Sequence, residues 1–325
     1  MEATNGNSEA IARMIRDART IAVCSHVNPD GDTLGCATAM RLALIRIGKE
    51  VSLFCDSKVP DQLSFLPGIQ EMRVPGENEG PFDLMLSVDV SDPKRLGSCT
   101  GLIGKSTHTA QIDHHPTNPL YMEANWVDGS APAACLLIRE MLKKLDVALD
   151  PDLAVCLYTG VSTDTGNFAF AATNADCFNL MSELMAQNLP IAKLNRILFR
   201  ERAMPQVLLL GKALNSLQYF ENGKIAVMKL TCDDFRECGA LSEHADTLVN
   251  FSLDTVGTRM SLLAREDDNQ AIKISLRAKE PDCINDIAQS FGGGGHPQAA
   301  GITMHGSLDE TVRKVLDAMI RKLNG

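Results

Sequence analysis

Short apolar segments alternate with helix-like stretches through the first half of the chain, and this alternation constrains the fold more than any other feature. The strand-like segments are Ile21–Cys24, Val51–Cys55, Leu84–Val90 and Thr109–Ile112. Between the first two, Leu34–Ile47 is apolar nearly all round, which indicates a buried helix, and Gly48 is a suitable stop for it. Strands that alternate with helices predict a mostly parallel sheet in a doubly wound α/β domain.

The second half of the chain has a different pattern. Two helical stretches, 191–200 and 206–217, precede a hairpin signal in which Asn222-Gly223 separates two short apolar runs. A second strand pair follows at 259–264 and 271–277. These features predict a smaller α+β domain. We place the first domain at residues 1–195, a helical linker at 196–211 and the second domain at 212–325.

Composition and charge narrow the class of protein. The 325 residues include 31 Lys and Arg against 41 Asp and Glu, a formal net charge of −10. Such a charge repels long polyanions, whereas proteins that coat long nucleic acid carry a basic stripe. No apolar run reaches the roughly 18 to 20 residues that span a bilayer, and residues 1–8 lack the layout of a signal peptide. We therefore expect a cytoplasmic protein that binds neither membranes nor long nucleic acid.

The ten cysteines are scattered singly along the chain, without a CxxC pair. This spacing excludes a zinc ribbon and a thioredoxin-type redox motif. Most of the cysteines lie in apolar segments, so we expect them to be reduced and buried as small hydrophobic side chains.

Acidic and histidine side chains stand mostly where the strand-like segments end. The set comprises His26, Asp30 and Asp32 in His26-Val27-Asn28-Pro29-Asp30-Gly31-Asp32, then Asp89, Asp113-His114-His115 and Asp164. Strand ends at a crossover form the usual ligand crevice of an open α/β sheet. Taken singly, Asp30 and Asp32 are also compatible with helix caps, and Asp164 with an Asx turn in a polar loop. Gly31 would permit an unusual backbone angle between the two aspartates.

Taken together, these carboxylates indicate a metal site. Asp30, Asp32, Asp89 and Asp164 would carry four negative charges in one crevice, and such a cluster needs raised pKa values or bound cations. Two divalent ions would balance the charge. Carboxylate and imidazole ligands without a thiolate suit manganese, and zinc or cobalt less specifically. Paired ions of this kind are a standard arrangement for phosphoester hydrolysis.

A glycine-rich segment near the C-terminus is the second candidate site. It consists of Gly292, Gly293, Gly294, Gly295 and His296. Four glycines let the backbone approach an anion closely, although the segment lacks the GK[ST] of a Walker A loop and is also compatible with a flexible linker. Arg277 and Arg259, near the predicted strands before it, are candidate phosphate partners, and a solvated surface role suits either equally well.

In order along the chain, these motifs resemble those of the DHH phosphoesterase family. The segment 26–32, Asp89, Asp113-His114-His115 and Asp164 match its four motifs, and 292–301 resembles the motif of the DHHA1 domain found in one branch. The resemblance covers essentially the whole chain. It implies a DHH domain followed by a smaller DHHA1 domain, with the active site in the cleft between them. Size and layout are similar to the branch of bacterial oligoribonucleases (nanoRNases) that also dephosphorylate 3′-phosphoadenosine 5′-phosphate (pAp).

The resemblance also implies roles for individual residues. One ion would be held by His26, Asp30 and Asp89, and a second by Asp32, Asp89, His114 and Asp164, with Asp89 bridging. His115 would contact the scissile phosphate and Asp113 would support the histidines, while a hydroxide bridging the ions would attack phosphorus in line. The glycine-rich segment with His296 would hold the nucleotide. Ala278 stands where the family commonly has Ser, and an alanine side chain cannot make the polar phosphate contact that the serine would make.

The implied activity is Mn²⁺-dependent hydrolysis of RNA of about two to five nucleotides to mononucleotides, and of pAp to AMP. A soluble phosphodiesterase of cyclic dinucleotides or linear pApA is the main alternative. Family II pyrophosphatases lack the glycine-rich segment, RecJ-like exonucleases are longer, and membrane-bound cyclic-di-AMP phosphodiesterases need membrane segments. A nucleotide sensor on the same fold is the non-enzyme alternative. Loss of a metal ligand would favour it, and none is lost. A homodimer is compatible with all of these readings.

Overall fold

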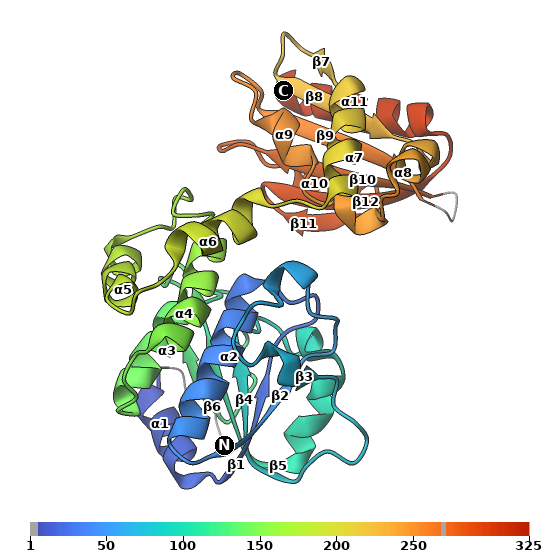
Figure 1. Cartoon of the computed structure of the whole chain (residues 1–325). Helices are drawn as coiled ribbons and strands as arrows, with labels where there is room; N and C mark the ends of the chain where they lie inside the picture. Colours follow the sequence, from blue (N-terminus) through green and yellow to red (C-terminus); the bar gives the residue numbers. More distant parts are fainter. Residues whose placement is uncertain (1–5, 268–270, 325) are drawn as a thin grey trace. The chain divides into compact units, whose positions relative to one another are not determined.

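The chain divides into two compact units, Met1–Glu201 and Arg202–Gly325 (Figure 1). The structure is a computed structural model that describes residues 6–267 and 271–324. The division falls inside the segment 196–211 that the sequence suggested as a linker. Helix α7 (Met204–Asn215) begins within that segment and buries Leu209 in the core of the second unit. Among the described residues, no helix combines the length and apolar character needed to cross a bilayer.

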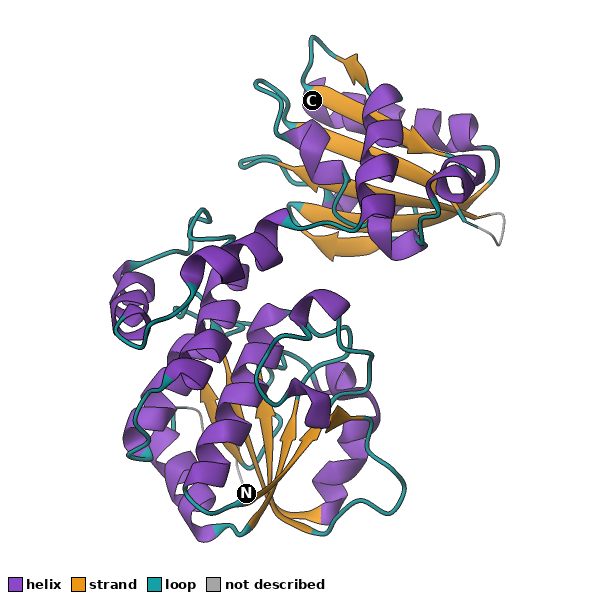
Figure 2. Cartoon of the chain, viewed as in Figure 1, coloured by secondary structure: helices purple, strands orange, loops and turns teal. Residues whose placement is uncertain are grey.

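A six-stranded, all-parallel sheet forms the centre of the first unit, with helices packed around it (Figure 2). The strands are β1 (Thr20–Cys24), β2 (Glu50–Phe54), β3 (Met72–Arg73), β4 (Phe82–Val88), β5 (Ser106–Asp113) and β6 (Ala124–Val127). Their order is β3-β2-β1-β4-β5-β6. Strands β2 and β3 therefore lie on one side of β1 and strands β4 to β6 on the other, so the strand order reverses between β1 and β4. Ligands of open α/β sheets bind at such a reversal. The predicted doubly wound α/β domain is confirmed.

Alternate residues of β1 separate two apolar layers. Ile21 and Val23 face the larger core, and Ala22 and Cys24 face a smaller one. The helices of the larger core are α1 (Ser8–Asp17), α2 (Gly31–Arg46), α3 (Ala134–Lys144), α4 (Pro151–Asp164) and α5 (Ala175–Met185). The smaller core lies under the 3₁₀ segment η3 (Pro93–Lys105). Short elements complete the unit: η1 (Asp61–Leu63), η2 (Ile69–Glu71), α6 (Ile191–Asn195) and the π-helical turn η4 (Arg196–Arg200).

The second unit is built on another six-stranded sheet, of order β11-β12-β10-β9-β8-β7. Its strands are β7 (Gln218–Phe220), β8 (Ile225–Leu230), β9 (Met260–Glu266), β10 (Ala271–Ala278), β11 (Gly294–His296) and β12 (Ala299–His305). Its helices are α7, α8 (Cys232–Cys238), η5 (Ser242–Ala245), α9 (Val249–Leu253), α10 (Asn285–Ser290) and α11 (Leu308–Asn324). All strand pairs are antiparallel except β8 with β9. The two predicted strand pairs and the α+β character are confirmed.

Candidate metal centre

The first candidate residues lie where β1 passes into α2. His26 is buried just beyond β1, and Asp30 forms the N-cap of α2. The Oδ1 atom of Asp30 accepts hydrogen bonds from the amides of Asp32 (3.1 Å) and Thr33 (3.2 Å), while its Oδ2 atom lies 3.5 Å from Nε2 of His26. Asp30 therefore caps the helix with one oxygen and presents the other to His26. Partial burial raises the pKa of Asp30, but His26 and the Thr33 amide outweigh it and hold the pKa below its ordinary value.

Gly31 has a different role from the one expected. It is the first residue of α2, and its backbone is helical. A Cβ atom at this position would lie 2.4 Å from Oγ1 of Thr163 on α4. The glycine therefore permits the close approach of α2 and α4, which brings Asp32 and Asp164 into one cluster.

Asp89 occupies the centre of this cluster. It follows β4 in a left-handed backbone conformation (φ 56°) and is only 2% exposed. Its Oδ2 atom lies 3.7 Å from Nε2 of His26, and its Oδ1 atom lies 3.4 Å from Nε2 of His114. Burial, and then the charge of Asp32, raise the pKa of Asp89 well above its ordinary value. Within the described residues, neither Oδ1 of Asp89 nor Nε2 of His26 has a hydrogen-bond partner.

His114 presents its Nε2 atom to the acidic side chains. That atom lies 3.1 Å from Oδ2 of Asp164 and 4.0 Å from Oδ2 of Asp32, while Nδ1 lies 3.0 Å from the carbonyl oxygen of Ala131. Because a carbonyl only accepts, Nδ1 carries a proton and donates it there. Burial lowers the pKa of His114, but the contacts with Asp164 and Asp32 raise it to about 9. Asp164 itself is the last residue of α4, not part of a polar loop.

Asp32 is fully buried against the N-terminus of α3. Its Oδ2 atom accepts a hydrogen bond from the Ala134 amide (2.5 Å) and its Oδ1 atom accepts one from the Cys135 amide (3.0 Å). Burial, and then the charge of Asp164, raise its pKa to about 7 even so. The sequence motif did not reveal these amide donors, since they lie about a hundred residues away along the chain.

His115 is oriented by Asp113, which is buried at the end of β5. Nδ1 of His115 lies 2.8 Å from Oδ1 of Asp113, and Nδ2 of Asn118 donates to Oδ2 of Asp113 (2.6 Å). Burial raises the pKa of Asp113, but the hydrogen bonds from His115 and Asn118 outweigh it and lower the pKa. Asn118 was not singled out from the sequence; its position five residues after Asp113 was the available signal.

Arg95 is another neighbour that the sequence did not single out. Its Nη2 atom lies 3.0 Å from Nδ1 of His26, and its carbonyl oxygen accepts a hydrogen bond from the Val27 amide. Arg95 lies in η3, a few residues after Asp89. Its guanidinium places positive charge beside the carboxylate cluster and contributes to the lowered pKa of Asp30.

The clustered donor atoms form overlapping sets of three residues, two of which include Asp89. One set is His26, Asp30 and Asp89, a second is Asp32, His114 and Asp164, and Asp89 also groups with His114 and His115. Within each set the donor atoms lie within 4.8 Å of one another. Nε2 of His26 and Oδ1 of Asp89 are buried without hydrogen-bond partners within the described residues, and the pKa values of Asp89 and Asp32 are raised, which is the arrangement expected for atoms that receive cations. The residues present therefore fit divalent ions, and their oxygen and imidazole donors suit Mn²⁺.

The second unit contains the other candidate residues. Gly294–His296 forms an edge strand, β11, which Gly292 and Gly293 precede outside the strand, so this part of the glycine-rich segment is not a flexible linker. Ala299 of β12 is directly opposite both His296 of β11 and Arg277 of β10, so these three side chains share one face of the sheet. No carboxylate of the described chain lies within 4.0 Å of the Arg277 guanidinium, and burial lowers its pKa more than the charge of Asp246 raises it. Arg259 instead forms two hydrogen bonds with Asp282 (2.7 and 2.5 Å).

Comparison with known proteins shows the family of this chain. Residues 20–161 match the family model described as the N-terminal domain of the DHH family, and residues 222–325 match the DHHA1 domain. The bifunctional oligoribonuclease and PAP phosphatase NrnA of Thermus thermophilus is 30% identical over 305 residues, which cover 93% of this chain and 90% of the relative.

Solved structures extend the comparison to the fold. An exopolyphosphatase-related protein from Bacteroides fragilis has a TM-score of 0.89 at 23% identity, over 97% of this chain and 95% of that one. RecJ from Thermus thermophilus in complex with Mn²⁺ has a TM-score of 0.54 at 15% identity, over 96% of this chain and 54% of RecJ. At these identities the likeness concerns the fold alone.

Proposed function

This chain belongs to the DHH family and is a phosphoester hydrolase, and on that premise we propose that it hydrolyses short oligoribonucleotides, of about two to five nucleotides, to mononucleotides with Mn²⁺. We further propose that it converts pAp to AMP. The name of the Thermus thermophilus relative supports both substrates. The net charge of −10 supports a short substrate, since a long polyanion would be repelled beyond the site.

The observation that carries the proposal is the position of Asp89 between two donor sets. We assign one ion to His26, Asp30 and Asp89, and a second to Asp32, Asp89, His114 and Asp164. Two divalent ions held there would balance the charge of the four carboxylates, lower the pKa of a bound water and offset charge on the phosphoryl oxygens. The manganese-bound RecJ structure supports the choice of ion on the basis of a shared fold.

We assign His115 to the scissile phosphate. Asp113 accepts the Nδ1 proton of His115 and so leaves Nε2 of that ring to face a substrate oxygen. This assignment makes Asp113 a positioning residue, because it acts through His115. His114, by contrast, directs its Nε2 atom into the carboxylate cluster, so the two adjacent histidines have separate roles.

We assign nucleotide binding in the second unit to Gly292–Gly295, His296 and Arg277. Arg277 is half-buried, has no carboxylate partner in the described chain and shares a face with His296, which suits a residue that pairs with phosphate. Arg259 is the weaker candidate, because its guanidinium is already engaged by Asp282.

A panel of substrates tests the proposal. Purified protein with Mn²⁺ is given a dinucleotide RNA, a long single-stranded RNA, pAp, pApA and cyclic-di-AMP side by side. We expect rapid release of mononucleotides from the dinucleotide, turnover of pAp, and weak activity on the long RNA. Faster turnover of cyclic-di-AMP than of the dinucleotide would replace this proposal with the cyclic-dinucleotide alternative, and binding without any turnover would favour a sensor.

Replacing the central carboxylate tests the assignment of ligands. Asp89→Asn weakens a donor in both sets, so we expect activity to fall by at least about a thousandfold and Mn²⁺ affinity to fall with it. Asp17→Asn, an exposed position at the end of α1, is the matched control and should behave as the unmodified protein. Near-normal turnover by Asp89→Asn would contradict the bridging role.

A further inference from the structure

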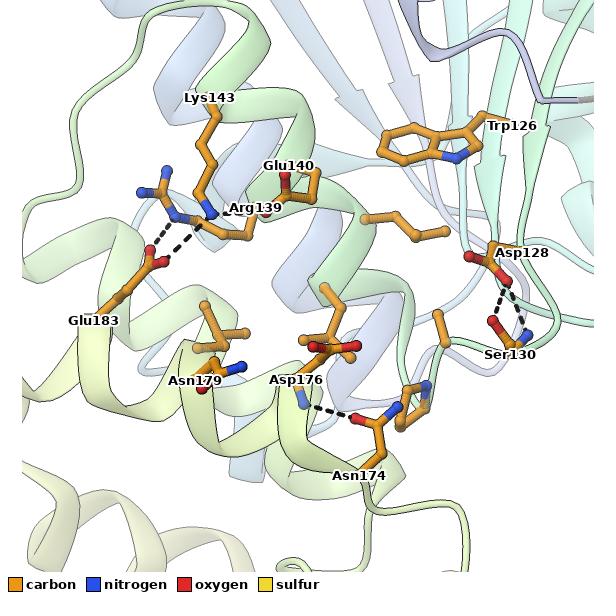
Figure 3. Close-up of a pocket in the computed structure, with 15 residues that line it drawn as sticks. Trp126, Asp128, Ser130, Arg139, Glu140, Lys143, Asn174, Asp176, Asn179 and Glu183 are labelled. Carbon is orange, nitrogen blue, oxygen red and sulfur yellow. Dashed lines mark hydrogen bonds and ion pairs between the residues drawn. The ribbon is translucent and has the colours of Figure 1, made fainter.

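A cavity opens in the first unit, outside the metal cluster. It has a volume of about 520 Å³ and lies between the end of β6 and helices α3 and α5 (Figure 3). Its described lining contains none of the clustered donor residues. A cavity of this size holds a small organic molecule rather than a single ion.

Apolar side chains form one part of the wall. Trp126 comes from β6, Leu136 and Leu137 from α3, and Leu180 from α5. Trp126 is only partly buried, so its ring retains surface toward the cavity. An indole ring attracts cations to its face and carbon chains by dispersion, so this wall favours a ligand with a hydrocarbon body.

The cationic side chains of the wall are already neutralised. Nε of Arg139 lies 2.6 Å from Oε2 of Glu183 (Figure 3). Nζ of Lys143 lies 2.7 Å from Oε1 of Glu140 and 3.3 Å from Oε1 of Glu183. Two carboxylates thus offset two cations at this end of the cavity. An anionic ligand would have to displace these carboxylates before it could pair with Arg139 or Lys143.

The remaining charge of the wall is negative. Asp128 and Asp176 also line the cavity, and neither has an ion-pair partner in the described part of the chain. Within the described residues, the carboxylate of Asp128 accepts hydrogen bonds from the neutral amide and hydroxyl of Ser130 alone (2.9 and 2.6 Å). Asp176 lies in the first turn of α5, so the helix N-terminus offsets part of its charge, but neither carboxylate has a cationic side chain as partner within the described residues. Together, beside an aromatic wall, they create a negative potential that a cation would relieve.

We propose that this cavity binds an organic cation, a protonated amine carried on a hydrocarbon chain, of the polyamine class. The amine would pair with Asp176 and Asp128, and the carbon chain would lie along Trp126 and the leucine wall. The carboxylates of this site are not among the donors of the metal cluster, although Ala131 of its lining accepts a hydrogen bond from His114. The existence of the site does not depend on the proposed substrates.

Trp126 makes the proposal directly measurable, because it is the only tryptophan in the chain. Its fluorescence is followed while spermidine is added to protein saturated with Mg²⁺, which occupies the metal cluster and prevents spermidine from binding there. We expect a saturable spectral change, confirmed by calorimetric titration. Adipate, which carries two negative charges on a hydrocarbon chain, is added in a parallel titration at equal ionic strength and should give no saturable change in the fluorescence of Trp126.

Asp176→Asn removes one of the two unpaired charges at an exposed position, where misfolding is not expected. Spermidine should bind about threefold to fivefold more weakly to this variant, the effect of one partly exposed ion pair. Asp317→Asn, on the exposed surface of α11 in the second unit, is the matched control and should bind spermidine normally. Tighter binding of adipate than of spermidine, the absence of a saturable signal, or equal affinities in both variants would overturn the proposal.

Discussion

Nδ1 of His115 lies 2.8 Å from Oδ1 of Asp113, while the other oxygen of Asp113 is held by Asn118. This pair fixes the proton of His115 on Nδ1, because an ionised carboxylate can only accept. The orientation of His115 is therefore set by a side chain that lies two residues away and is itself buried.

Replacement of Asp113 by Asn should disturb His115 without removing it. The Asn118 amide would still require an acceptor, so the new amide group would turn its oxygen to Asn118 and its NH₂ to His115. We expect kcat on a dinucleotide RNA to fall about 10- to 100-fold with little change in KM, as for other residues that orient a site histidine. Asp17→Asn serves as the exposed control. An effect confined to KM would contradict the positioning role.

The sequence reveals most of the cluster because parallel strands end at one edge of the sheet. His26, Asp89 and the pair His114-His115 each follow a strand, so the predicted alternation of strands and helices already places them together. Asp164 lies at the end of a helix, and only the close approach of α2 and α4 at Gly31 brings it in.

Other parts of the site depend on contacts that no local pattern encodes. The amides that hold Asp32 come from the start of α3, and Arg95 reaches His26 from η3. Gly294–His296, in the glycine-rich segment, forms an edge strand because β12 lies beside it and supplies hydrogen-bonding partners. Tertiary pairing of this kind overrides the flexibility that glycine has in isolation.

Metal binding should strengthen as pH rises. In the folded chain the pKa of Asp32 is about 7, against an ordinary value near 3.9, so the metal-free protein holds a proton there between these values. Because the unfolded chain releases this proton first, the free energy of unfolding of the metal-free protein falls as pH rises from about 4 to 7. Mn²⁺ must displace the proton, and also one from His114, whose pKa is about 9.

The measurement is the rise in Tm caused by Mn²⁺ at pH 6 and at pH 8.5. We expect a larger rise at the higher pH, with apparent affinity gaining up to about tenfold per pH unit for each proton displaced. In Asp32→Asn no proton has to leave this side chain, so the change in Mn²⁺ affinity with pH near pH 7 should become smaller. Equal shifts of Tm at both pH values would show that no proton is displaced.

Two neighbouring glycines should respond differently to alanine. At Gly295 the backbone has φ 145°, and a Cβ atom would lie 2.4 Å from the carbonyl oxygen of Ala299. Gly295→Ala should therefore separate β11 from β12 and lower Tm, with a cost of about 1 to 3 kcal/mol. At Gly294 a Cβ atom would meet no described atom within 4 Å, so Gly294→Ala should keep the Tm of the unmodified protein.

Gly294→Ala then becomes a probe of the ligand. If the nucleotide approaches the backbone of β11, the added methyl group should raise KM severalfold while Tm and kcat stay unchanged. An unchanged KM would remove Gly294 from the proposed binding surface.

Arg277 and Arg259 should give opposite results when each is replaced by Met. Arg277 is half-buried without a carboxylate partner, so Arg277→Met removes a desolvated charge and should leave Tm unchanged or slightly higher. The same change should raise the KM for pAp about tenfold or more if Arg277 pairs with phosphate. Arg259→Met leaves the carboxylate of Asp282, only 14% exposed, without its partner, so Tm should fall while KM stays the same. If KM rose in Arg259→Met and not in Arg277→Met, Arg259 would be the residue that binds phosphate. Substrate phosphate would then displace Asp282 from Arg259.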